Sequence, residues 1–212
     1  MSRVSKALWG LSAFLSVGVA VFSYRFLLPH PMMGDEIAAN LVRKPWLPIH
    51  AAFAATALLV GPFQFLTRLR ARRPGLHRTL GKVYVAACLL AAPAGLVLGT
   101  HSSAGPIAQW GFSVLAVLWF AATARAFWLA TQGRIAEHRR WMVRSWAMTF
   151  AAVTLRLYLP IPPMLLHMDF LDGYRAISWV SWVANLVVAE AYLNWPALTA
   201  RMRRRGAVAA MG

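Results

Sequence analysis

The sequence predicts an all-α integral membrane protein, a bundle of six transmembrane helices in which helices two to five form the core. Two observations predict this fold. Of the 212 residues, 59% are hydrophobic and only 13% are charged. The apolar residues also form runs long enough to cross a bilayer core of about 30 Å. Because no polar linker divides the chain, we expect a single domain over residues 1–212.

The predicted helices span residues 7–28, 48–69, 81–100, 108–130, 141–159 and 176–195. The first follows a short basic start, as the apolar part of a signal peptide does. It is too long for a typical signal peptide, however, and no cleavage site with small residues follows it. We therefore expect this segment to be retained as a helix.

The orientation follows from the distribution of basic residues, which give a net charge of +16. Arginine and lysine concentrate in residues 67–82, in 133–144 and in the tail at 201–205, whereas residues 100–109 and 159–174 contain neither. Only Arg43 and Lys44, in the first outer loop, depart from this alternation. The positive-inside rule then places both termini in the cytoplasm. Basic residues in alternate loops indicate a lipid bilayer as the partner and argue against nucleic acid.

Most common kinds of catalytic site are excluded. The single cysteine, Cys88, lies in an apolar run and allows neither a disulfide within the chain nor a cysteine-rich metal site. With 6 acidic residues in the chain, paired-carboxylate chemistry is not expected. A phosphate-binding glycine loop, a nucleophile elbow and the His-Glu-x-x-His zinc motif are all missing from the sequence. Whether the protein is an enzyme stays open.

Ionisable groups inside membrane helices are costly and mark candidate sites. An inner layer contains His77 and His138, each in a His-Arg pair at the start of a helix, with Arg144 and Glu190 slightly deeper. We predict that Arg144 and Glu190 form a buried ion pair. Further polar candidates within the helices are Gln64, Tyr84 and Asn185.

An outer layer contains His50, His101 and Arg156, near the opposite ends of helices two, three and five. Helical spacing puts one set of residues on a common face of helix five, which we expect to look into the bundle. This set is His138, Ser145, Thr149, Val153 and Arg156.

Histidines in a helical bundle raise the question of haem b, because neutral imidazole is an axial ligand of haem iron. His77 with His138 is the leading pair and His50 with His101 the second, with Arg144 and Arg156 available to pair with haem propionates. The leading pair predicts an apolar cleft with Trp141 or Tyr84 near its wall. The alternatives are interfacial histidines in polar loops, or a non-haem metal or proton-handling site.

Five strings carry a family resemblance: Gly61-Pro-Phe-Gln-Phe65, the stretch from His77 to Tyr84, His138-Arg-Arg-Trp-Met-Val-Arg-Ser145, Leu155-Arg-Leu-Tyr-Leu159 and Trp182-Val-Ala-Asn-Leu186. With His50 they span helices two to six. On these strings the chain resembles the bacterial predicted membrane proteins grouped as domain of unknown function two-three-zero-six. The resemblance implies a bacterial inner-membrane protein and no particular activity.

The helix count is also similar to that of transmembrane b-type cytochromes of the ascorbate-dependent kind, which hold two bis-histidine haems. Here helix three would carry two histidines and helix four none, which departs from that pattern. The leading functional hypothesis is a haem-binding or redox membrane protein with its site at His77 and His138. The alternatives are a small permease or flippase-like transporter with a polar path along Arg144, Arg156, Asn185 and Glu190, and a non-catalytic partner in a homo-oligomer or larger membrane complex.

Overall fold

The computed structural model describes residues 3–32 and 35–209. Residues 1–2, 33–34 and 210–212, which the single-domain prediction includes, lie outside this description. In the described part of the chain every regular element is a helix. Six helical stretches are long and apolar enough to cross a membrane, as the sequence predicts: Ala7–Leu27, Arg43–Gln64, Pro74–Thr100, Pro106–Thr131, Ile135–Leu165 and Phe170–Trp195.

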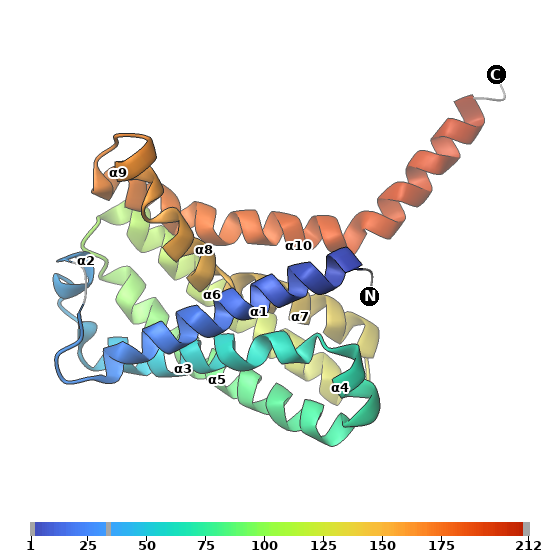
Figure 1. The fold of residues 1–212 in the computed structure, drawn as a ribbon, viewed down its shortest axis with the longest axis horizontal. Coiled ribbons are helices and arrows are strands. Elements are labelled where there is room, and N and C mark those ends of the chain that lie inside the picture. The colour runs from blue at the N-terminus through green and yellow to red at the C-terminus, as the bar shows by residue number, and fades with distance from the viewer. Residues whose placement is uncertain (1–2, 33–34, 210–212) are drawn as a thin grey trace.

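The elements follow one another as α1 (Arg3–Ser23), η1 (Tyr24–Leu27), α2 (Asp35–Ala38), α3 (Arg43–Gln64), α4 (Thr67–Arg72), α5 (Pro74–Thr100), α6 (Pro106–Thr131), α7 (Ile135–Thr149), α8 (Ala151–Tyr158), α9 (Ile161–Leu165) and α10 (Phe170–Ala209). In Figure 1 the short helices α2 and α9 lie at one end of the bundle, and the chain termini lie toward the other. We call these the α2/α9 end and the terminal end.

The core lies where helices α3, α5, α6 and α7 meet, so the prediction that helices two to five form the core is confirmed. α3 packs against α5, α5 against α6, and α6 against α7. The buried residues at this centre include Ala57, Tyr84, Cys88, Trp119 and Met148. α1 and α10 pack on the outside of this bundle (Figure 1).

Several helices begin earlier than predicted, and proline explains two of these differences. α5 begins at Pro74 and α6 at Pro106, each with proline in the first turn, where the missing N–H is not needed for a hydrogen bond. α3 also begins earlier than predicted, at Arg43, although Lys44 near its start is not helical, and it ends at Gln64 because Leu66 adopts an extended conformation. His77 therefore lies in the first turn of a helix, and His50 lies well inside one.

The fifth predicted helix is interrupted. α7 ends at Thr149 and α8 begins at Ala151, with Phe150 between them. The predicted inward face nevertheless holds across this interruption, because Ser145, Thr149 and Val153 are all buried. α10 is much longer than predicted, and its C-terminal part projects away from the bundle beyond its apolar span (Figure 1).

Candidate functional site

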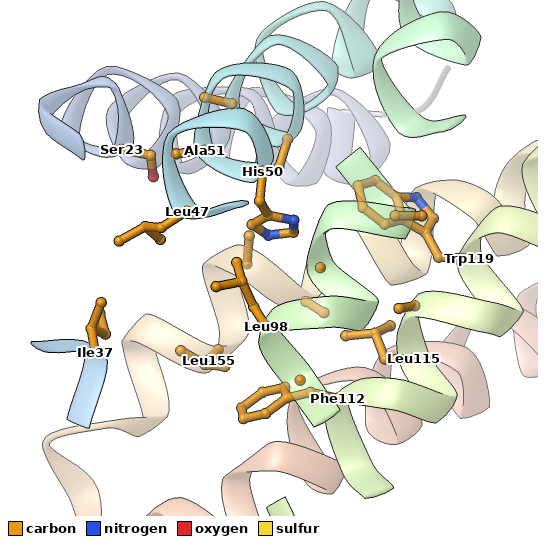
Figure 2. A pocket seen from close by; sticks show the side chains of 18 of the residues that line it. Ser23, Ile37, Leu47, His50, Ala51, Leu98, Phe112, Leu115, Trp119 and Leu155 are labelled. Atoms are coloured by element: carbon orange, nitrogen blue, oxygen red, sulfur yellow. The ribbon is translucent and has the colours of Figure 1, made fainter. Parts of the chain in front are cut away.

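A cavity of about 270 Å³ opens among the helices at the α2/α9 end (Figure 2). Its walls are largely aliphatic and aromatic, with Leu47, Leu98, Phe112, Leu115 and Trp119 among them. Ligand sites are typically concave, mostly apolar and equipped with a few placed polar groups. The polar side chains on these walls are Ser23, Asn40, Arg43, His50, Ser102, Thr149, Arg156 and Tyr174.

His50 projects from α3 into this cavity (Figure 2). Its Nδ1 lies 2.9 Å from the carbonyl oxygen of Ala91 on α5, which accepts the hydrogen bond. The ring can approach α5 this closely because Gly95 has no side chain: a Cβ there would lie 2.9 Å from the imidazole. With Nδ1 donating to the carbonyl, Nε2 is left as an acceptor or ligand atom.

Arg156 lies on α8 at the wall of the same cavity. Its guanidinium donates to the Ala152 carbonyl at 2.8 Å and to the Ser23 hydroxyl at 3.0 Å, which ties α8 to α1. Arg43 is a second cation on the cavity wall. The ion pairs recorded for the described residues involve neither arginine. Cations beside an apolar cavity that pair with no described carboxylate favour an anionic ligand.

The floor of the cavity is closed by a network of buried hydroxyl groups. The Thr149 hydroxyl lies 2.7 Å from the Tyr84 hydroxyl and accepts from the Trp119 indole at 2.9 Å. The Ser145 hydroxyl lies 3.0 Å from that of Tyr84 and 2.7 Å from that of Thr123. Tyr84 is therefore only 1% exposed and fills the space between α5 and α7. Tyr84 thus packs behind the wall of this cavity and does not line it.

The structure separates the second predicted histidine pair. His50 contacts the carbonyl of Ala91, ten residues before His101 on α5, which corresponds to about 15 Å along a helix. His101 is exposed, and its Nδ1 bonds within its own helix to the Val97 carbonyl at 3.0 Å. We predicted His50 and His101 at one depth because both lie near helix ends. The early start of α3 moves His50 deeper into the bundle.

His77 and His138 do lie near one another, at the terminal end. The two rings are within electrostatic range of each other. His138 has its Nδ1 2.8 Å from the Ala126 carbonyl on α6, whereas Nδ1 of His77 is buried without a partner. Among the residues that the structure describes, no group of three or more histidine, cysteine or acidic side chains could hold a metal ion.

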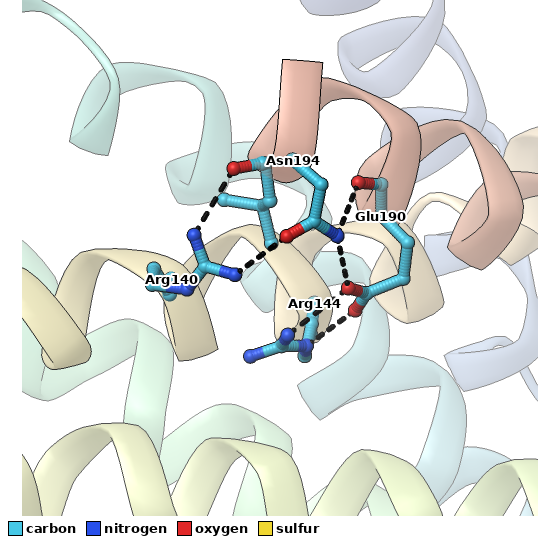
Figure 3. A network of polar contacts seen from close by, with 5 residues as sticks. Arg140, Arg144, Glu190 and Asn194 are labelled. Atoms are coloured by element: carbon cyan, nitrogen blue, oxygen red, sulfur yellow. Dashed lines mark hydrogen bonds and ion pairs between the residues drawn. The ribbon is translucent and has the colours of Figure 1, made fainter. Parts of the chain in front are cut away.

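The predicted ion pair between Arg144 and Glu190 is confirmed (Figure 3). Nε of Arg144 lies 2.5 Å from one carboxylate oxygen, and Nη2 lies 3.1 Å from the other. Arg140 adds a parallel link from α7 to α10, because it donates to the Leu193 carbonyl at 3.0 Å and to the Asn194 side chain at 3.1 Å. These contacts fasten α10 to the core.

The four residues of the predicted transport path are not brought together. Arg144 and Glu190 neutralise each other, and the Asn185 amide donates to the Ala147 carbonyl and to the Thr154 hydroxyl, both at 3.1 Å. Arg156 alone faces the cavity. The sequence indicates His50 and Arg156 as candidate site residues, whereas Arg43 and Asn40 on the same wall are found only in the structure. Arg43 had a signal, because it departs from the alternation of loop charge.

No curated protein matches the chain, and neither does any solved structure. Residues 47–193 match a family described as predicted membrane protein (DUF2306). The matched range covers α3 from its second turn through most of the apolar part of α10, and so includes His50, Arg156 and the core. The chain belongs to this family of predicted membrane proteins.

Proposed function

We propose that the protein binds an amphipathic anion in the cavity at the α2/α9 end. The observation that carries the proposal is the placement of Arg43 and Arg156 on the wall of an otherwise apolar cavity, where neither forms an ion pair with any carboxylate that the structure describes. A buried or half-buried cation in a membrane protein is costly unless something compensates its charge. A ligand with a carboxylate or phosphate head would supply that compensation.

The remaining lining residues suit the other parts of such a ligand. Leu98, Phe112 and Leu115 offer apolar surface to a hydrocarbon chain. Nε2 of His50 can hydrogen-bond to a polar head group, since its Nδ1 is already engaged. A volume of about 270 Å³ lies just below the usual range for small-molecule sites, which favours a short-chain or partly inserted ligand. Binding would serve transport or storage of the ligand in the membrane.

The test compares a medium-chain fatty acid with the fatty alcohol of the same chain length. Calorimetry on the purified protein in neutral detergent should give the acid at least tenfold higher affinity. A charge-assisted hydrogen bond contributes about 1.5–3 kcal/mol, and about 1.4 kcal/mol is tenfold in affinity. Arg156→Gln should reduce the preference for the acid and leave only the part that Arg43 supplies. Arg156→Lys, which keeps the charge, should retain a large part of the preference.

The control is Arg125→Gln, which removes the same charge from a side chain stacked over Trp128, away from the cavity lining. It should leave both affinities unchanged. Equal affinity of the unaltered protein for acid and alcohol would contradict the proposal. So would an unchanged acid preference in Arg156→Gln, provided that this variant unfolds at the usual temperature.

Haem b at His77 and His138 is a second candidate function. It is supported by the electrostatic proximity of the two rings and by the Nδ1 contact of His138 with a backbone carbonyl, an arrangement that metal-bound histidines often share. Protein expressed with added haem should then show a Soret band that His77→Ala or His138→Ala abolishes and His30→Ala preserves. Colourless protein would rule this candidate out.

We further propose that the protein resides in a bacterial inner membrane with both termini in the cytoplasm. The alternation of basic and uncharged loops supports this orientation. A homo-oligomer or a larger membrane complex would be compatible with the apolar outer faces of α1 and α10, which hold Phe14, Val187 and Val188 exposed. Lipid alone would cover these faces equally well.

A further inference from the structure

One arginine of the short helix α4 differs from its neighbours. Arg68 and Arg72 are exposed, but Arg70 is half-buried and turns back toward the bundle. Its Nη1 donates to the backbone carbonyl of Gln64, the last residue of α3, at 3.3 Å. α4 also packs against α5. Arg70 therefore lies between the end of one membrane helix and the start of the next.

Other cationic groups gather around this point at the terminal end. Arg70 is within electrostatic range of Arg139 on α7 and of His77 on α5. Burial, reinforced by the positive charge of Arg139, lowers the pKa of the Arg70 guanidinium. The ion pairs recorded for the described residues are formed by other arginines, at positions 134, 144 and 175. Within the described part of the chain, no carboxylate therefore forms an ion pair with Arg70 or Arg139.

Two polar atoms at the same place are buried without a hydrogen-bond partner. The first is the amide nitrogen of Gln64, a residue only 7% exposed, and the second is Nδ1 of His77. The Gln64 side chain lies against Gly81, one turn beyond His77, where a Cβ would come within 3.3 Å of its amide oxygen. A buried donor left unsatisfied costs about 1–3 kcal/mol, so such groups usually have a partner.

We propose that Arg70, Gln64, His77 and Arg139 form a binding site for a phosphate group at the terminal end of the bundle. A phosphate offers several acceptor oxygens, which would satisfy the free Gln64 amide and neutralise the arginines. The site lies where a membrane helix meets the interface, a position in which basic pockets bind anionic lipid head groups. The same chemistry could come from a soluble phosphate. This site is separate from the cavity, and its test is independent of the cavity proposal.

The experiment measures lipid adducts by native mass spectrometry of the purified full-length protein in neutral detergent. The probes are phosphatidylglycerol, which is anionic, and phosphatidylcholine, which is zwitterionic. Phosphatidylglycerol should bind at least tenfold more tightly. Arg70→Gln should weaken its binding at least fivefold, whereas Arg72→Gln, the same charge change at an exposed position on the same helix, should weaken it less than twofold.

Gln64→Leu separates a ligand contact from a structural role. The leucine removes a buried donor that has no protein partner, so the lipid-free variant should unfold at the same or a higher temperature. Its binding of phosphatidylglycerol should nevertheless fall at least threefold. A variant that loses stability while it binds phosphatidylglycerol as tightly as the original would contradict the proposal.

A competition experiment with inorganic phosphate identifies whether the phosphate group belongs to a lipid or to a soluble molecule. Inorganic phosphate added at millimolar concentration should leave the phosphatidylglycerol adducts in place if the site serves lipid. If inorganic phosphate displaces them, the site serves a soluble phosphate. Equal effects of Arg70→Gln and Arg72→Gln would mean diffuse attraction to a basic surface and would overturn the site. A Soret band that depends on His77 would overturn it as well.

Discussion

At the scale of single residues, the ion pair between Arg144 and Glu190 lies nearer the surface than the sequence suggested. Their side chains are 21% and 42% exposed, and Asn194 donates a further hydrogen bond to the carboxylate at 3.3 Å. The sequence predicts a buried pair, because both residues lie at comparable depth within apolar segments. α7 meets α10 at the rim of the bundle, so part of each charge stays accessible. The cost of breaking the pair is correspondingly smaller.

Glu190→Gln should therefore lower the free energy of unfolding by about 1 kcal/mol, the upper end for an exposed pair, rather than by the amount expected of a buried one. Combining it with Arg144→Gln should restore part of this loss, because the unpaired guanidinium is removed as well. Thermal or denaturant unfolding in detergent measures both effects. Strictly additive losses would show that the two side chains do not interact in solution.

The matched control for this pair is Arg134→Gln. Arg134, the residue that precedes α7, pairs with Glu137 in the first turn of that helix, and both side chains are nearly half exposed. It should change the free energy of unfolding by at most a few tenths of a kcal/mol. A loss as large as that of Glu190→Gln would mean that the measurement reports overall charge.

The sequence predicts this ion pair because two opposite charges at the same depth in apolar helices are less costly when they pair. The cavity could not be predicted in the same way. Arg43 is more than one hundred residues from Arg156, and the two line one cavity with His50 only after the bundle has folded. The predicted depth of each residue places His50 and Arg156 in one layer. Depth along a helix does not determine the direction of a side chain, so it predicts neither that His101 faces away from the cavity nor that Arg43 lines it.

At the scale of helices, the sequence predicts the number and order of the membrane-spanning helices correctly, but it predicts their first and last residues less accurately. Hydropathy finds the part of a helix that crosses the bilayer, whereas helices here continue into the polar interface. This explains why α5 and α10 exceed their predicted ranges. The interruption at Phe150 had no signal, because neither glycine nor proline occurs there.

Residues at equivalent positions in α5 and α7 lie at the same depth in the bundle, from the first turn of each helix into the core. Tyr84 contacts Ser145, 61 residues later, and the same offset separates His77 from His138 and Pro74 from Ile135. Two helices that start at one depth and run in one direction maintain this correspondence turn by turn. The sequence similarity around the two His-Arg pairs therefore reflects equivalent positions in the bundle. The parallel course of α5 and α7 places both histidines at the terminal end, near the basic cluster formed by Arg70 and Arg139.

At the scale of the whole molecule, charge divides the bundle into two ends. The terminal end carries the basic stretches at 67–82 and 133–144. The α2/α9 end has few basic residues, and two of them, Arg43 and Arg156, line the cavity. The positive-inside rule concerns basic residues in loops, so cations kept at the opposite end need another explanation. Ligand binding in the cavity supplies one.

The orientation in the membrane is the last prediction. We expect the loop that contains α4 and the C-terminus to be cytoplasmic, and the turn between α5 and α6 to face outward. Single cysteines at Arg72, Arg203 and Ser103 test this with a membrane-impermeant thiol reagent applied to intact cells. Only Ser103→Cys should be labelled, while all three should react after the cells are opened. The unaltered chain is the control, since its single cysteine, Cys88, is fully buried and should not react in either case.

Labelling of Arg72→Cys in intact cells would invert the orientation. The cavity would then open to the cytoplasm, and the basic cluster around Arg70 would face outward, where anionic lipid is no longer the expected source of its phosphate.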